Sequence, residues 1–186
     1  MSLQMTASQT VGPFLHIGMD WLNHGELEGS GERIVLEGRV RDASGAPVPD
    51  AVIEIWQANA AGRYAHPDDP RGLPADAGFR GFGRLPTDAG GRFRFSTVKP
   101  GRVPAPDASL QAPHIVVLVF MRGLLKHLVT RVYFPGDPAN GDDPVLKLVP
   151  PERRGTLVAQ AAAGRPGVLD WSINLQGADE TVFFDV

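Results

Sequence analysis

The stretch that decides the fold reads IVLEGRVRD at residues 34–42, SGAPVPD at 44–50 and AVIEIWQ at 51–57. Its first and last parts are rich in β-branched residues, and apolar side chains alternate with others along the last part. The middle part consists mainly of Ser, Gly, Pro and Asp, which are typical turn formers. The sequence therefore predicts a strand, a turn and a second strand, as in a β-hairpin.

Similar patterns recur along the chain. TDAGGRFRF at residues 87–95 predicts a second hairpin, in which Asp and Gly build the turn and Phe93 and Phe95 share one face. Strand patterns also cover residues 114–121, 126–134, 168–177 and 180–185, whereas residues 151–163, with prolines at the start and four alanines, predict one short helix. About eight strands in an all-β chain favour a β-sandwich.

Two segments lack a regular pattern. Residues 1–33 contain scattered glycines and predict an extended N-terminal arm that wraps a partner surface. The connection at residues 58–86 is longer than a compact domain usually has without a function, so we expect a functional or partner-bound loop. The predicted organisation is an arm at 1–33 and one sandwich domain at 34–186.

Composition excludes several classes of function. The 186 residues carry a formal charge of −3 without a basic run, which argues against nucleic acid as a partner. The chain has no cysteine, which excludes thiolate nucleophiles, zinc–thiolate sites and iron–sulfur clusters and is consistent with a cytoplasmic location. The longest apolar run, residues 115–121, is far shorter than the ~20 residues of a membrane-spanning helix, so no membrane association is expected.

Metal binding is the class of chemistry that the sequence does not argue against. No serine lies in a Gly-x-Ser-x-Gly elbow, no phosphate loop occurs, and no spacing selects a pair of carboxylates. Among five histidines, His114 opens an apolar strand, where a second ligand on the same face would lie at position 116. That position holds Val116. Tyr64 can supply a phenolate to a ferric ion, or simply pack on the long loop.

Several motifs in order resemble the intradiol ring-cleaving dioxygenases. They are EIWQANAAGRY at residues 54–64, GRLPTD at 83–88, TVKPG at 97–101, APHI at 112–115 and YFPGD at 133–137. The resemblance extends from about residue 8 to the C-terminus, and it implies a β-sandwich fold.

The resemblance also implies a set of metal-ligand positions. Catalytic chains of the family hold a non-haem ferric ion with two tyrosinates and two histidines. Tyr64 and His114 match one ligand of each kind, whereas Val103 and Val116 replace the other two, and valine has no lone pair to donate. Gln111 replaces an arginine that assists catalysis in those chains. The resemblance therefore implies that this chain holds no metal of its own and keeps only vestigial ligand positions.

SQTVGPFLHIG at residues 8–18 and ETVFFD at 180–185 are similar to the non-metal, alpha-type chains of this family. Such chains form hetero-oligomers with a beta-type chain that holds Fe(III) and cleaves a carboxylated catechol with O2. The resemblance then places Thr10, Gly12, Pro13 and Arg131 in the substrate pocket at the boundary between the two chains.

Two alternatives remain at this point. The hairpin patterns also occur in transthyretin-like sandwiches, which bind or scaffold without catalysis. An autonomous dioxygenase would need substitute ligands such as His66 or His127, but neither lies two residues from His114. The arm and the Thr-Arg-x-Tyr-Phe strand favour the heteromeric enzyme over both.

Overall fold

The structure is a computed structural model that describes residues 4–69, 71, 76 and 78–185. Strands dominate this part of the chain, which confirms the all-β prediction, although it contains eleven strands where about eight were expected. The helical segments are α1 (Phe14–Ile17) and the 3₁₀ turns η1 (Asp20–Leu22), η2 (Pro138–Gly141), η3 (Leu146–Leu148) and η4 (Pro151–Leu157). The strands are β1 (Arg33–Arg41), β2 (Val52–Trp56), β3 (Phe82–Pro86), β4 (Arg92–Val98), β5 (Val103–Pro104), β6 (Leu110–Gln111), β7 (His114–Phe120), β8 (Leu128–Tyr133), β9 (Gln160–Ala161), β10 (Val168–Asp170) and β11 (Ile173–Asn174).

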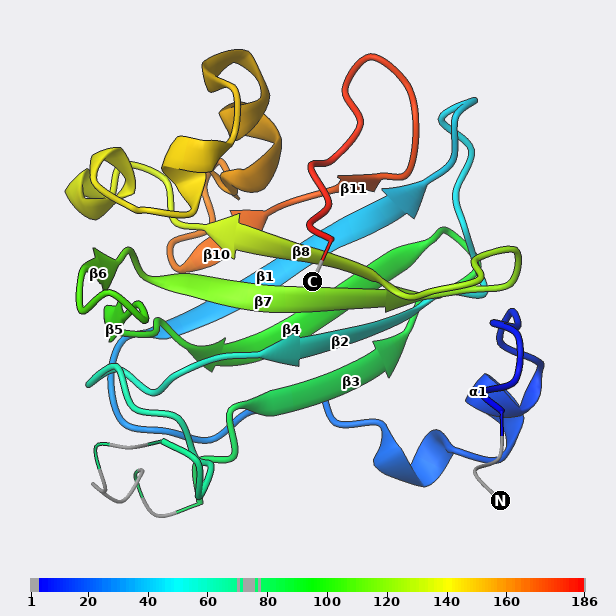
Figure 1. The fold of residues 1–186 in the computed structure, drawn as a ribbon, viewed down its shortest axis with the longest axis horizontal. Helices are drawn as coiled ribbons and strands as arrows, with labels where there is room; N and C mark the ends of the chain where they lie inside the picture. Colours follow the sequence, from blue (N-terminus) through cyan, green and yellow to red (C-terminus); the bar gives the residue numbers. More distant parts are fainter. Residues whose placement is uncertain (1–3, 70, 72–75, 77, 186) are drawn as a thin grey trace.

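Two main sheets form the sandwich (Figure 1). One has the strand order β3-β2-β7-β8, and every neighbouring pair in it is antiparallel. In the other, β1 pairs with β4 on one side and with β10 and β11 on the other, and β9 extends the sheet beyond β10. The short β5–β6 ribbon lies at the end of the first sheet where β7 begins.

The core lies between the two sheets. Alternate residues of β1 and β4, such as Leu36 and Phe95, meet alternate residues of β2 and β7, such as Ile53 and Ile115. Phe93 and Phe95 share a face as predicted, and their ring centroids are 6.2 Å apart. This two-sided burial of alternating side chains is the usual way in which a sandwich is stabilised.

Both predicted hairpins are wrong in one respect: their strands do not pair with each other. β1 and β2 belong to different sheets, and so do β3 and β4, so each turn carries the chain from one sheet across to the other. The turn residues act as expected, because Asp88 Oδ1 accepts hydrogen bonds from the backbone N–H of Gly90 and Arg92. The residues of a turn decide its local conformation. The sheet that each flanking strand joins depends instead on residues that are distant in the sequence.

Other boundaries also differ from expectation. Strand β3 lies inside the predicted loop 58–86, where it pairs with β2. The predicted helix at 151–163 is a 3₁₀ turn only as far as Leu157, and Ala159 then donates its N–H to the carbonyl of Tyr133, so pairing with the β8 end overrides the local helix preference. Residues 180–185 form only an isolated bridge, between Phe184 and Val129, rather than a strand.

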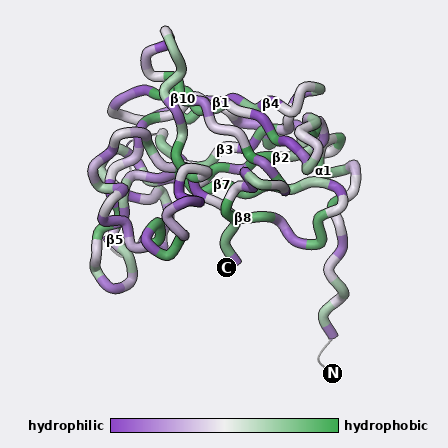
Figure 2. The backbone as a smooth tube through the Cα atoms, turned by 90° about the horizontal axis from the view of Figure 1, so that it is seen from above, coloured by the Kyte–Doolittle hydropathy of each residue, from purple (hydrophilic) through white to green (hydrophobic). Residues whose placement is uncertain are grey.

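The N-terminal segment crosses the edges of both sheets. His24 pairs with Arg84 of β3, and Glu26 pairs with Ser96 of β4. Figure 2 shows the chain before α1 extending away from the body of the molecule. Within the described residues, no helix combines the length and apolarity that crossing a membrane would require.

Candidate functional site

The vestigial ligand positions lie together on the outer face of the β2–β7–β8 sheet, at the end where β7 begins. His114 and Val116 are two residues apart on β7 and share a face. Across the sheet, Val116 lies opposite Trp56 on one side and Arg131 on the other, while His114 lies opposite Tyr133. Val103 on β5 pairs with Gln111, which leads into β7.

Tyr64 completes this group from the loop after β2. Its ring is parallel to that of Trp56, with centroids 5.8 Å apart. Its backbone N–H donates to Asp69 Oδ2, which also pairs with Arg71 at 2.5 Å. Burial raises the pKa of the Tyr64 phenol, while the charges of Arg131 and Arg71 act in the opposite direction. The phenol is therefore held in its neutral form at neutral pH.

His114 is buried, with 5% of its surface exposed. Its Nδ1 lies 2.8 Å from the carbonyl oxygen of Ala112, so Nδ1 carries the proton and donates it. Burial lowers the pKa of His114 to about 4, and the charge of Arg131 acts in the same direction. The ring is 5.8 Å from that of Tyr133. His114 is thus a neutral, fully packed histidine.

Arg131 provides the positive charge of this group. Its Nη1 donates to Oε1 of Gln111 at 2.7 Å, and Nε2 of Gln111 donates to the carbonyl of Pro104. The guanidinium is half-buried and influences the pKa of Tyr64, His114 and Tyr133. A permanent cation therefore lies among the positions that hold a metal in catalytic chains.

A cavity of about 580 Å³ opens beside Trp56 and Tyr64. Besides these aromatic rings, residues of the 66–71 loop and of the β5–β6 connection line it, namely His66, Asp68, Asp69, Arg71, Pro104, Ala105, Pro106 and Ala108. His66 meets Trp56 edge-on, with centroids 6.2 Å apart. The cavity has the size and apolar walls of a small-molecule site.

The donors present do not fit a ferric ion. The four positions offer one phenol and one imidazole, and the side chains of Val103 and Val116 have no lone pair. The half-buried Arg131 charge opposes a second cation there. In the part of the chain that the structure describes, no three His, Cys, Asp or Glu side chains gather into a group that could hold a metal. His127 cannot substitute, because it packs against Phe120 at the far end of β7.

The predicted pocket residues of the arm lie elsewhere. Thr10 Oγ1 accepts a hydrogen bond from the N–H of Gly123, in the turn between β7 and β8. Gly12 and Pro13 are exposed, and a Cβ added to Gly12 would meet no atom within 4 Å. The part of β7 from Val116 to Phe120 spans about 13 Å. The structure therefore places Arg131 beside the vestigial positions at one end of β7, whereas Thr10 contacts the turn at the other end.

Two buried polar residues that position this region escaped sequence reasoning. Arg84, 3% exposed, pairs with Glu54 and donates from Nη2 to the carbonyl of Leu15, which fixes the arm against β3. Asp143, 0% exposed, accepts hydrogen bonds from the Tyr133 hydroxyl and the Ala112 N–H, just before His114. No pattern in the sequence marked either residue, because Arg84 lies in a segment without apolar alternation and Asp143 lies in a loop.

Comparisons with known proteins agree with this architecture. A family model described as dioxygenase matches residues 17–177. The chain is 46% identical to the protocatechuate 3,4-dioxygenase alpha chain of Burkholderia cepacia, over 100% of this chain and 99% of that one. It is 42% identical to the beta chain from the same organism, over 81% of this chain and 67% of that one.

A solved structure described as an intradiol ring-cleavage dioxygenase from Tetranychus urticae shares the fold. Its TM-score is 0.62 at 18% sequence identity, and the match covers 82% of this chain and 85% of that chain. The β-sandwich predicted from the sequence is therefore confirmed. These matches favour dioxygenases over transthyretin-like binding modules.

Proposed function

This chain belongs to the intradiol dioxygenase family, and on that premise we propose that it is the alpha-type subunit of a protocatechuate 3,4-dioxygenase. It is a close homologue of an alpha chain along its full length, and the beta chain of the same enzyme is also homologous to it. The partner we infer is accordingly a beta-type chain, and the assembly is a hetero-oligomer.

The reaction we assign to the assembly is the cleavage of protocatechuate between its two hydroxylated carbons. Both oxygen atoms of O2 enter the product, 3-carboxy-cis,cis-muconate, so no other oxidant is needed. Intradiol dioxygenases use Fe(III), which supplies the redox chemistry of this step when bound. In our proposal the beta-type chain holds that iron.

One observation carries this assignment: two of the four ligand positions are valine in this chain, Val103 and Val116. The half-buried charge of Arg131 beside them supports it, because a cation already lies where a second one would be placed. This chain then contributes to catalysis through shape and contacts at the boundary with its partner, not through its own metal.

The arm is the part of this chain that we assign to the shared pocket. Thr10, Gly12 and Pro13 are exposed, and Gly12 leaves open space beside the backbone, so a flat aromatic ring can approach closely. The hydrogen bond from Gly123 to Thr10 and the contact of Arg84 with Leu15 hold the arm in place. These residues would bind and orient the substrate and exclude water.

Arg131 was expected to share this pocket. Arg131 lies opposite Val116 in the sheet, whereas Thr10 contacts the turn between β7 and β8. We therefore propose that Arg131 acts within its own chain, as the cation of the vestigial group. The cytoplasmic location and the division into an arm at 1–33 and a sandwich at 34–186 stay predictions.

Reconstitution of activity tests the proposal. This chain, a candidate beta-type chain and a mixture of the two are assayed for protocatechuate-dependent O2 uptake. We expect turnover in the mixture, and a rate at least tenfold lower for either chain alone. Equal turnover by the beta-type chain with and without this chain would contradict the proposal.

A further inference from the structure

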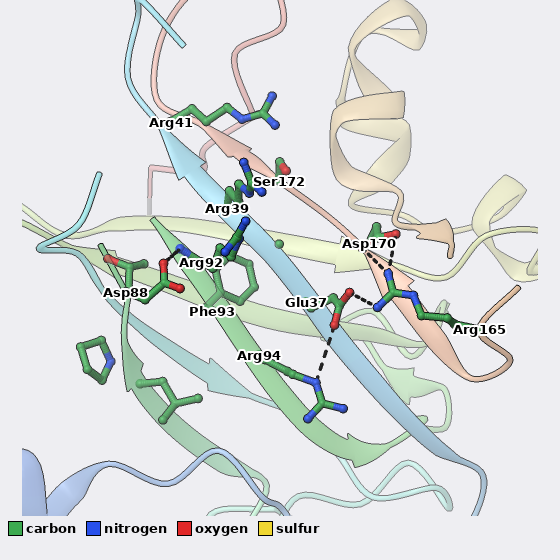
Figure 3. A pocket seen from close by; sticks show the side chains of 14 residues that line it. Glu37, Arg39, Arg41, Asp88, Arg92, Phe93, Arg94, Arg165, Asp170 and Ser172 are labelled. Atoms are coloured by element: carbon green, nitrogen blue, oxygen red, sulfur yellow. Dashed lines mark hydrogen bonds and ion pairs between the residues drawn. The ribbon is translucent and has the colours of Figure 1, made fainter. Parts of the chain in front are cut away.

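The outer face of the β1–β4 sheet carries a groove of about 960 Å³, on the opposite sheet from the vestigial group (Figure 3). Five arginines and three carboxylates line it, which leaves an excess of two positive charges in a chain whose formal charge is −3. The arginines are Arg39, Arg41, Arg92, Arg94 and Arg165, and the carboxylates are Glu37, Asp88 and Asp170.

At one end of the groove the charges compensate each other. Glu37 accepts a hydrogen bond from Nη1 of Arg165 and lies 3.6 Å from Nε of Arg94. Arg165 also lies 3.4 Å from Asp170. Figure 3 shows these four side chains joined in one network. This end therefore has little capacity for a further anion.

At the other end three arginines have no ion-pair partner among the described residues. Arg39 and Arg92 lie directly opposite each other on antiparallel strands, and Arg41 follows Arg39 by two residues on the same face. None of the three side chains forms an ion pair or hydrogen bond within the described residues. Like charges in directly opposed positions destabilise a sheet, so this arrangement is costly unless an anion lies between them.

Asp88 is the one carboxylate near these arginines among the residues that line the groove. Its Oδ1 already accepts two backbone hydrogen bonds, from Gly90 and Arg92, each at 2.8 Å. The backbone hydrogen bond from Arg92 and the charges of Arg92 and Arg39 lower the pKa of Asp88. Asp88 therefore offsets part of the charge of Arg39 and Arg92.

We propose that Arg39, Arg41 and Arg92 form a binding site for a small polycarboxylate. A guanidinium binds a carboxylate through two parallel hydrogen bonds. Arg39 and Arg41 start about 7 Å apart along β1, and Arg39 and Arg92 start about 5 Å apart across the strands. This spacing suits separate carboxylates on one short carbon chain better than a single phosphate.

The surroundings suit such a ligand. Ser172 lines the same end and offers a hydroxyl donor, while Leu85 and Pro86 provide an apolar wall for the carbon chain. Ring opening of a carboxylated catechol yields a tricarboxylate, so the proposed reaction would supply a ligand of this class. The site itself is inferred independently of that reaction.

Titration calorimetry with propane-1,2,3-tricarboxylate tests the site in the full-length chain. We expect saturable binding of one molecule per chain, weakened at least tenfold in Arg39→Gln/Arg92→Gln. This variant should unfold at the same temperature as the unsubstituted chain or higher, because it removes a like-charge pair. Arg41→Gln alone should weaken binding severalfold and provides a second test if the double variant folds poorly.

The matched control is Arg122→Gln/Lys126→Gln, which removes two exposed positive charges from the β7–β8 turn. It should leave binding unchanged. If the control variant bound the tricarboxylate equally weakly, the effect would depend only on net charge, and the proposal would be overturned. The proposal would also be overturned by absence of saturable binding, or by equal or tighter binding of acetate or inorganic phosphate at matched ionic strength.

Discussion

Arg131 and Gln111 are joined by a hydrogen bond of 2.7 Å from Nη1 of the arginine to Oε1 of the glutamine. Gln111 stands where catalytic relatives are expected to carry an arginine, and Arg131 lies opposite Val116, a vestigial ligand position. The pair therefore keeps one guanidinium group in this region, but the arginine that supplies it lies on β8. The positive charge of the vestigial group therefore comes from the chain itself.

The first prediction concerns Arg131. In the assembled enzyme, Arg131→Met should leave the ratio of kcat/KM for protocatechuate and catechol unchanged within about twofold. It should also lower the unfolding free energy of this chain by about 1–2 kcal/mol, because the hydrogen bond to Gln111 is lost. Steady-state kinetics and urea unfolding measure these two quantities.

The outcome separates two roles for Arg131. A decrease of tenfold or more in the preference for protocatechuate would place the guanidinium at the substrate carboxylate, as the sequence alone suggested. Gln111→Ala is the control, since it removes the partner of Arg131 and keeps the charge. It should reproduce the stability loss without any change in preference.

The second prediction concerns Gly12 in the arm. Gly12→Val should leave the stability of the isolated chain unchanged within ~0.5 kcal/mol, because an added Cβ meets no atom within 4 Å. In the assembled enzyme it should raise the KM for protocatechuate at least tenfold, since the side chain would intrude on the shared pocket. Gly141→Val, also in open space, is the matched control and should leave KM unchanged.

Much of the fold could be predicted from the sequence because strand and turn signals are local. Residues 34–42 and 114–121 closely match β1 and β7, and the Asp88 turn forms as expected. The pairing of the strands could not be predicted, since β1 and β2 are adjacent in sequence but lie in different sheets. Strand β3 was missed because Gly83 and Arg84, both buried, break its apolar alternation.

The candidate site could also be predicted only in part. Motif positions placed Tyr64, Val103, His114 and Val116 in one group. Strand register brings Val103, His114 and Val116 together, and stacking on Trp56 adds Tyr64. The distance between Arg131 and the arm depends on which end of the β7–β8 hairpin each contacts, and no local pattern contains that information. The opposed arginines of β1 and β4 also became visible only through cross-strand register.

The third prediction concerns Asp143. This buried carboxylate accepts hydrogen bonds from Tyr133, Ala112, Val145 and Leu146. Asp143→Asn should destabilise the chain by about 2–3 kcal/mol, because charge-assisted bonds are lost and one amide donor faces other donors. Tyr133→Phe, which removes a single bond, should cost about 1 kcal/mol. Equal losses in the two variants, measured by urea unfolding, would contradict this ranking.

The fourth prediction is a pH dependence of stability from His114. Its pKa of about 4 in the folded chain lies below the ordinary value of 6.5. As pH falls below 6.5, the unfolded chain takes up a proton that the folded chain does not accept until about pH 4. This group therefore lowers stability progressively across that window, by up to about 3 kcal/mol, and has no such effect above it.

His114→Asn provides the comparison, since an amide can still donate to the Ala112 carbonyl but does not titrate. Urea unfolding of both proteins at intervals from pH 7 to pH 4 gives the difference in slope. We expect the variant to lose less stability on acidification. Parallel curves would show that His114 titrates normally in the folded chain.

The location of the iron tests the central claim most directly. This chain and a beta-type partner are purified separately and as the assembled enzyme, and the iron content of each chain is measured by mass spectrometry after separation. The account predicts about one iron per partner chain and less than a tenth of that in this chain, because Val103 and Val116 offer no donor. Stoichiometric iron in this chain, with protocatechuate turnover by the chain alone, would contradict it.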